Sequence, residues 1–254
     1  MGTSTWHRSP ETPEWERVRE LYSRPEPSPR EIVRAIVAAL DPETRTGMSD
    51  PAVVTCLGVL IEGTQQVAAQ GLPATLAALG VGQEPVAVQM AAGLRSRAQQ
   101  LITQQRWASR PGDLAVEAIG TTALALAALQ AEGVGFLEVQ LAAVQTGLTS
   151  LAQTDRLHEV AELFVGHKLD RAFRHFVARD LQEFVGGVGV PTVSHANRLE
   201  DAVAAHCREG CAALDLGEYE QVVRRVHTLD APGRVRELTP VMAQGVYQGL
   251  TILS

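Results

Sequence analysis

The middle of this chain carries almost no charge. Residues 48–150 hold four arginines and seven acidic residues, which is 11 charged side chains in 103 positions, whereas the two flanks together hold 40 in 151. The other positions are mostly Ala, Leu, Val, Gln and Gly, with the apolar residues at helical spacing. A helix with so little charge cannot present an ordinary wet face. We therefore expect these helices to be covered, by the rest of the chain or by other chains.

The composition narrows the class of protein. A chain of 254 residues with 45% hydrophobic residues can bury a sizeable globular core. Only 4% of the residues are aromatic, so Leu, Val and Ala must fill that core. The net charge of −7 argues against a surface that binds nucleic acid, because phosphate contacts need a basic patch. The basic residues are 21 arginines and a single lysine, Lys168, a bias typical of a GC-rich bacterial genome.

The sequence also favours a cytoplasmic location. Three cysteines, Cys56, Cys207 and Cys211, are an odd number and too few for a disulfide framework, which indicates reduced thiols. The N-terminus has no apolar stretch of the secretory type. The longest uncharged run, residues 63–83, contains four glutamines and a proline, so we expect no membrane span.

Prolines are concentrated near the N-terminus, and we expect residues 1–27 to be a poorly ordered segment. A short helix over 13–22 could still dock on the body through its apolar side chains. Residues 28–254 are expected to form a single helical domain. A sub-boundary near residue 153 would separate a charge-poor part from a His-rich part, over 48–152 and 155–254.

Capping residues, prolines and glycines divide the rest of the chain into helices. The pattern predicts an all-α fold, either a multi-helix bundle or a helical-hairpin array, of about eight to ten helices and without a convincing strand. We expect the helices within 50–152 to form the most buried layer. The expected starts include Ser28-Pro29 and Asp50-Pro51, the latter for a helix to about Gln70. Further starts are expected at Asp113, for a helix to about residue 132, at Thr154 or Asp155, and at Ser194, and the last helix is expected to open at Thr239-Pro240.

The apolar face changes direction inside the stretch 155–185. The residues before Gly166 and those after it lie on faces about 120° apart at 100° per residue. We expect either two helices that meet near Gly166, or one helix that changes its packing partner there.

Six of the seven histidines lie within 158–227, and this is the main chemical hint of the chain. The segment His158-Glu159-Val160-Ala161-Glu162 resembles the His-Glu-x-x-His helix motif of metallopeptidases, with Glu162 in place of the second histidine. On a helix His158 and Glu162 would share a face and could hold one metal ion, with Glu159 as the base. The alternative is ordinary pairing of these side chains at the surface. Di-iron helical bundles use a Glu-x-x-His motif on each of two helices, and no such motif occurs in the chain, which argues against a di-iron site.

Cys207 and Cys211 are the second pair of weak metal-site candidates. Four residues apart on a helix, they would share a face. A structural zinc site would need two more ligands, such as His195 and His227. The alternative, which we favour, is that both thiols pack as small hydrophobic groups, so no metal and no cofactor is predicted.

No sequence motif identifies a reaction: the chain has neither a phosphate-binding Gly-x-x-x-x-Gly-Lys loop nor a Gly-x-Ser-x-Gly elbow. The first hypothesis is therefore a non-enzymatic helical interaction or scaffold protein that is homo-oligomeric or part of a larger bacterial complex. The second is a helical enzyme that depends on a metal or a small molecule and uses the His-rich half. The third is a helical regulator that senses a small ligand.

Overall fold

The computed structural model describes residue 6, residues 9–129 and residues 140–254. Within these ranges the chain forms α-helices and three short 3-10 helices and no strand, with one isolated bridge between Val185 and Val190. Nine α-helices of the described residues have ten residues or more, which confirms an all-α fold of about the predicted size. The α-helices are α1 Pro13–Tyr22, α2 Pro29–Ala39, α3 Pro42–Gly47, α4 Pro51–Gln70, α5 Leu72–Ala78, α6 Val86–Gln105, α7 Arg110–Ala128, α8 Leu141–Gln153, α9 His158–Leu181, α10 Val193–Cys211, α11 Glu220–Arg225 and α12 Ala231–Leu253.

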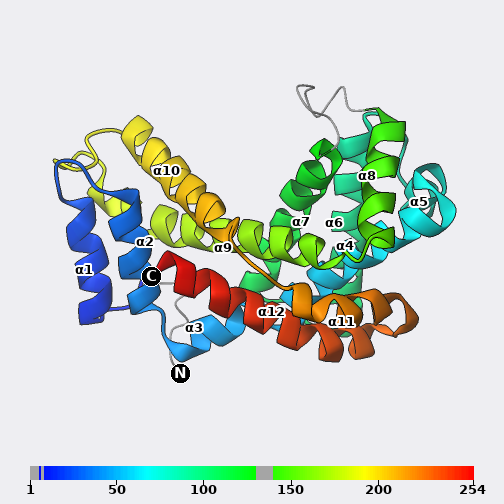
Figure 1. Ribbon diagram of the computed structural model, residues 1–254. Helices are drawn as coiled ribbons and strands as arrows, with labels where there is room; N and C mark the ends of the chain where they lie inside the picture. The colour runs from blue at the N-terminus through cyan, green and yellow to red at the C-terminus, as the bar shows by residue number, and fades with distance from the viewer. Residues whose placement is uncertain (1–5, 7–8, 130–139) are drawn as a thin grey trace.

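The helices are arranged around α9, which runs through the centre of the molecule (Figure 1). Helix α10 rises from α9 on one side, α7 and α8 rise on the other, and α12 lies beneath. Helix α4 packs against α6, α7, α8 and α12. The molecule thus has two arms, α10 on one side and α7 with α8 on the other, whose ribbons diverge from α9 in a V shape.

Local sequence signals set most helix starts. The side chains of Ser28, Asp50 and Asp230 accept a backbone N–H in the first turns of α2, α4 and α12, and each of these helices has a proline at its start. A capping oxygen satisfies an N–H that lacks an intrahelical partner, and proline fits where no such donor is needed.

Three predicted helix starts were wrong. Helix α7 is capped by Ser109, whose Oγ accepts the N–H of Gly112 at 3.0 Å, because Pro111 sits in the first turn rather than outside the helix. Helix α10 is capped by Thr192 instead of Ser194. Helix α9 begins at His158 without a side-chain cap, so neither Thr154 nor Asp155 caps it. The predicted end of α7 near residue 132 lies outside the described residues.

Helix α12 also differs from the prediction, because it continues through Pro240 instead of starting there. Proline removes one intrahelical hydrogen bond and crowds the preceding turn. The residues around it, Leu238, Val241 and Met242, are nevertheless fully buried. This burial keeps the segment helical across the proline.

Helix α9 is continuous across Gly166, so the two-helix alternative is wrong. A Cβ at Gly166 would lie 3.3 Å from Cβ of Cys211, which shows that α10 approaches closely here. Farther along α9, Phe176 instead packs against Trp6 and Trp15, with ring centroids 5.0 and 6.0 Å apart. The change of face predicted at Gly166 therefore reflects a change of packing partner within one helix.

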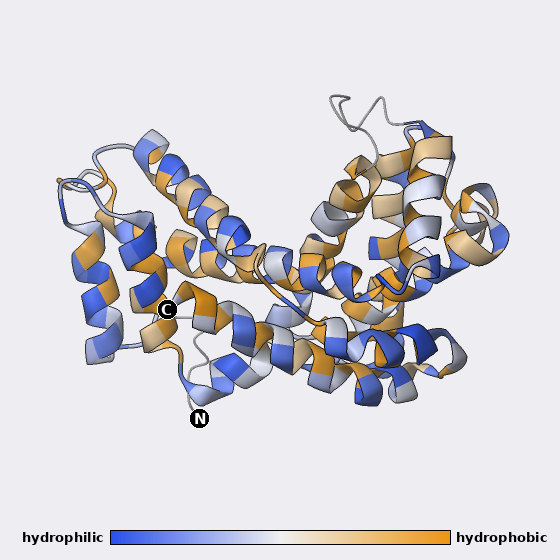
Figure 2. Cartoon of the chain, in the orientation of Figure 1, coloured by the Kyte–Doolittle hydropathy of each residue, from blue (hydrophilic) through white to orange (hydrophobic). Residues whose placement is uncertain are grey.

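The most buried layer is not the whole of 50–152. In α4, 13 of 20 residues are buried, and in α9, 15 of 24, whereas only 4 of 13 are buried in α8. The prediction was wrong in two ways: α8 lies at the edge despite its low charge, and α9 is central despite its many ionisable residues. Figure 2 shows the uneven hydropathy of the chain, with many hydrophilic residues on α1 and α10 and mostly pale or hydrophobic ones on α7 and α8.

Within the N-terminal segment, α1 forms over the predicted residues. It buries Trp15, Val18, Leu21 and Tyr22 and packs against α2. The segment Pro42–Gln70 is long and apolar enough to cross a membrane, but 72% of its most apolar window is buried inside the protein. The absence of a membrane span stays a prediction.

Candidate ligand-binding groove

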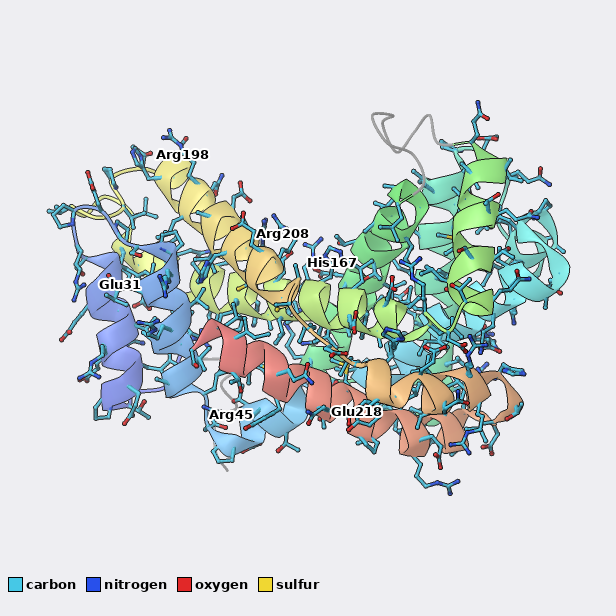
Figure 3. All side chains as sticks on the ribbon, in the orientation of Figure 1. Glu31, Arg45, His167, Arg198, Arg208 and Glu218 are labelled. Atoms are coloured by element: carbon cyan, nitrogen blue, oxygen red, sulfur yellow. The ribbon has the colours of Figure 1, made fainter. Side chains whose placement is uncertain are left out.

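A groove of about 440 Å³ lies above α9, between α10 on one side and α7 and α8 on the other. Its walls come from α7, α8 and α10, and Figure 3 places His167 and Arg208 at its base. The lining is mostly aliphatic, from Ala125, Leu126, Leu129, Leu151, Leu163, Gly166, Ala212 and Leu214. Cys211 and the polar side chains of Glu159, Glu162, His167 and Arg208 complete it. A mostly apolar concavity with a few polar groups is typical of a small-molecule site.

The imidazole of His167 is the most unusual polar group of this groove. The residue is only 9% exposed, and neither Nδ1 nor Nε2 has a hydrogen-bond partner among the described residues. Burial lowers the pKa of His167 below its usual value, so the ring is neutral near pH 7. A buried donor or acceptor that forms no hydrogen bond destabilises the folded state by about 1–3 kcal/mol. The fold thus holds one donor and one acceptor unused at the base of an apolar groove.

Two of the charged groups at the groove are neutralised by neighbours. The Arg208 guanidinium lies 2.9 Å from Oδ2 of the buried Asp170. Glu159 accepts a hydrogen bond from Arg156 at 2.8 Å. Neither pair adds net charge to the groove.

Glu162 is the third charged group, and it has no counterion. Its Oε1 accepts the backbone N–H of Leu216 at 2.7 Å, and no basic side chain of the described residues forms an ion pair with it. Burial raises the pKa of Glu162 above its usual value, whereas the N–H of Leu216 and the nearby imidazole of His158 lower it, and the carboxylates of Asp215 and Glu159 raise it further. Glu162 is therefore the one charged side chain of the described lining that forms no ion pair.

The two predicted metal-site candidates His158 and Glu162 have different hydrogen-bond partners. His158 Nδ1 lies 2.9 Å from Oε2 of Glu220, which also accepts the His158 backbone N–H. Glu220 in turn accepts a hydrogen bond from Arg224 at 2.8 Å. These contacts fasten α11 to the start of α9. In the described ranges no three His, Cys, Asp or Glu residues lie close enough to hold a metal ion.

The three cysteines are free thiols buried in the core. Cys207 and Cys211 share the face of α10 that meets α9 and α12, and Sγ of Cys211 lies 3.6 Å from the place of a Cβ on Gly249. Burial raises the pKa of all three thiols, to about 12 for Cys211. A thiol that stays protonated is a poor metal ligand and a poor nucleophile.

The single lysine is buried in the core, one residue after His167. Lys168 is 0% exposed, its Nζ has no hydrogen-bond partner among the described residues, and the ring of Trp6 lies 5.0 Å away. Burial lowers the pKa of Lys168 to about 8, although Asp50 and Cys56 oppose that shift. Lys168 does not line the groove above α9.

Sequence reasoning did not single out His167 or Arg208. The signal was present: an ionisable residue sits beside Gly166, where the apolar face of α9 changes direction. Arg208 lies between Cys207 and Cys211 in the sequence of α10, and the four-residue spacing of these cysteines indicated a possible site at the thiols but gave no signal for the arginine. No protein-family model, curated protein or solved structure matches this chain.

Proposed function

We propose that this protein binds a small, mainly apolar molecule in the groove above α9 and works as a ligand-sensing protein. The observation that carries the proposal is His167, a buried imidazole at the base of an apolar groove, whose two nitrogens have no hydrogen-bond partner among the described residues. Buried polar groups in folded proteins are almost always paired. An unpaired one at a concave apolar surface favours a bound partner that is not part of the chain.

The position of the groove suits a sensor. Its walls come from two arms of the molecule, whose helices α7 and α10 both pack against α9. A ligand held between α7 and α10 would bind the folded chain and not the unfolded one, and so would stabilise it. Ligand binding would also fix the angle between the arms.

The test uses Nile red, a neutral dye whose fluorescence rises in apolar surroundings. Two exposed alanines give a matched pair of variants: Ala212 lines this groove, and Ala243 lines a second groove of about 640 Å³ between α2, α3 and α12. We expect Ala212→Trp to weaken dye binding about tenfold, which is about 1.4 kcal/mol, and Ala243→Trp to leave it unchanged. The reverse result, or no binding by the unmodified protein, would overturn the proposal.

The scaffold hypothesis stays a prediction beside this one. That hypothesis was based on the few charges in residues 48–150, whose helices need to pack against other parts of the chain or against other chains. Helix α4 has that cover within the chain, from α6, α7, α8 and α12, so an outside partner is not needed to explain it. Native mass spectrometry of the purified protein measures the oligomeric state directly: a defined multimer would support self-association, and a monomer would count against it.

A further inference from the structure

The charges around the groove select among the ligands that its apolar walls could accept. Arg208 and Glu159 each form an ion pair, and His167 is neutral. Among the described residues of the lining, this leaves Glu162 as the one charged side chain without an ion-pair partner, although His158 lies near enough to interact with it electrostatically. Asp215, just outside the lining, adds a second negative charge close to Glu162. A carboxylate or phosphate entering here would meet acidic groups without a free cation to bind it.

Glu162 is also placed to receive a donor. Its Oε1 is engaged by the N–H of Leu216, which holds the side chain in one orientation, and Oε2 has no partner among the described residues. The aliphatic side chains of Leu163 and Leu214 lie beside it in the lining. In such partly apolar surroundings, a hydrogen bond to an ionised group contributes more than one between neutral groups.

His167 agrees with this selection. A neutral imidazole offers a lone pair that can accept from an N–H donor. Each of the two arginines near it has a carboxylate partner, Asp170 for Arg208 and Glu117 for Arg171. An anionic group would gain no counterion at His167. A protonated amine could satisfy the lone pair, and its apolar part would lie against the leucines of α7, α8 and α9.

We propose that the ligand of this groove is a lipophilic amine in its protonated form. Its ammonium group binds Glu162, and its apolar part occupies the groove between α7 and α10. This inference rests on the proposed function, since it names the chemical class of the ligand at the same groove. It concerns the charge of the ligand, which the Nile red test does not address.

The experiment compares three probes with the same eight-carbon chain: n-octylamine, 1-octanol and octanoate. Isothermal titration calorimetry of the full chain at pH 7 is expected to show octylamine binding about tenfold more tightly than octanol, and octanoate more weakly than octanol. Equal binding of all three would overturn the amine inference while leaving an apolar groove in place. No binding of octylamine would overturn the inference too, and the Nile red result would then decide separately whether the groove binds ligands at all.

Two variants with the same change in charge locate the effect. Glu162→Gln keeps an oxygen that can accept from Leu216 but removes the charge, and it is expected to reduce octylamine affinity to that of octanol without changing octanol binding. Glu159→Gln is the control, because Glu159 is already paired with Arg156, and an effect of less than about threefold is expected. Equal losses in both variants would mean that long-range charge, and not contact with Glu162, attracts the amine.

Discussion

Helices α4 and α9 are the two most buried long helices of the described chain, and they handle polar groups in opposite ways. In α4 the buried hydroxyls of Thr55 and Thr64 donate to carbonyls of their own helix, and Glu62 pairs with Arg234 of α12. Only Oε1 of Gln65 lacks a partner there. In α9 both nitrogens of His167, Nζ of Lys168 and Oδ1 of Asp170 lack one, and these residues are consecutive or nearly so.

The difference indicates that α4 serves the packing of the core, whereas the middle of α9 carries polar groups that packing alone does not explain. The side chains of α4 are what an ordinary core needs, because apolar burial and satisfied polar groups both stabilise the folded state. Unpaired ionisable groups in the middle of α9 oppose folding. Local departures from good packing rules in natural proteins occur mostly at functional or strained sites. This contrast is why the groove above α9, and not the charge-poor block, carries the proposed function.

The largest expected effect tests whether the two helices share one core. Leu57 of α4 and Leu169 of α9 are both fully buried. Each Leu→Ala change is expected to lower the free energy of unfolding by about 3 kcal/mol, because it removes apolar contacts and leaves a cavity. Urea unfolding of the two variants measures this. A loss under about 1 kcal/mol at Leu169 would show that α9 is loosely packed, which would remove the contrast.

The sequence predicted the positions of the helices better than it predicted which helices are buried. Proline and capping residues gave α2 and α4 almost to the residue, because these signals act within one turn. They failed at Pro240, where burial of neighbouring side chains outweighs the local cost of proline. Low charge predicted correctly that α4 is buried, but it failed for α8, since an uncharged surface of Gln, Thr and Ser can still face water.

The site was harder to predict because it depends on three-dimensional neighbours. The spacing of His158 and Glu162 placed them on one face as expected. However, their hydrogen-bond partners come from later in the chain, Glu220 from 62 residues after His158 and Leu216 from 54 residues after Glu162. His167 appears ordinary in the sequence, and its unpaired nitrogens are evident only when α7 and α10 are in place. Long-range contacts of this kind leave no periodic signal.

The second prediction replaces the buried amine of α9. We expect Lys168→Met to raise the free energy of unfolding at pH 7 by up to about 3 kcal/mol, since the pKa of about 8 lies well below the ordinary value of 10.5 and each pKa unit is worth about 1.4 kcal/mol. The cation–π contact with Trp6 is lost and reduces the gain. A variant less stable than the unmodified protein would show that the amine is held favourably, contrary to the comparison with α4.

The pH dependence gives this prediction its sign. The unfolded chain holds the lysine proton more tightly than the folded one, so the penalty is complete below about pH 8 and disappears as the pH rises to about 10.5. The stability difference between Lys168→Met and the unmodified protein should therefore shrink over that range. Tyr22, Cys207 and Cys211 titrate in both proteins, and their contributions cancel in the difference. Cys56 interacts electrostatically with Lys168, so its contribution does not cancel completely.

The smallest expected effect comes from His167 and joins stability to binding. His167→Leu removes two unpaired nitrogens and keeps a buried apolar side chain, so we expect the free energy of unfolding to rise by about 1–2 kcal/mol at pH 7. Because folding lowers the pKa of His167, the unfolded chain takes up the proton first, and the advantage of the variant should grow as the pH falls below about 6.5. The same variant should bind octylamine more weakly than the unmodified protein does. A gain in stability with a loss of binding is the trade-off expected of a functional side chain. A loss of stability would instead make His167 an ordinary part of the core, and α9 would then resemble α4.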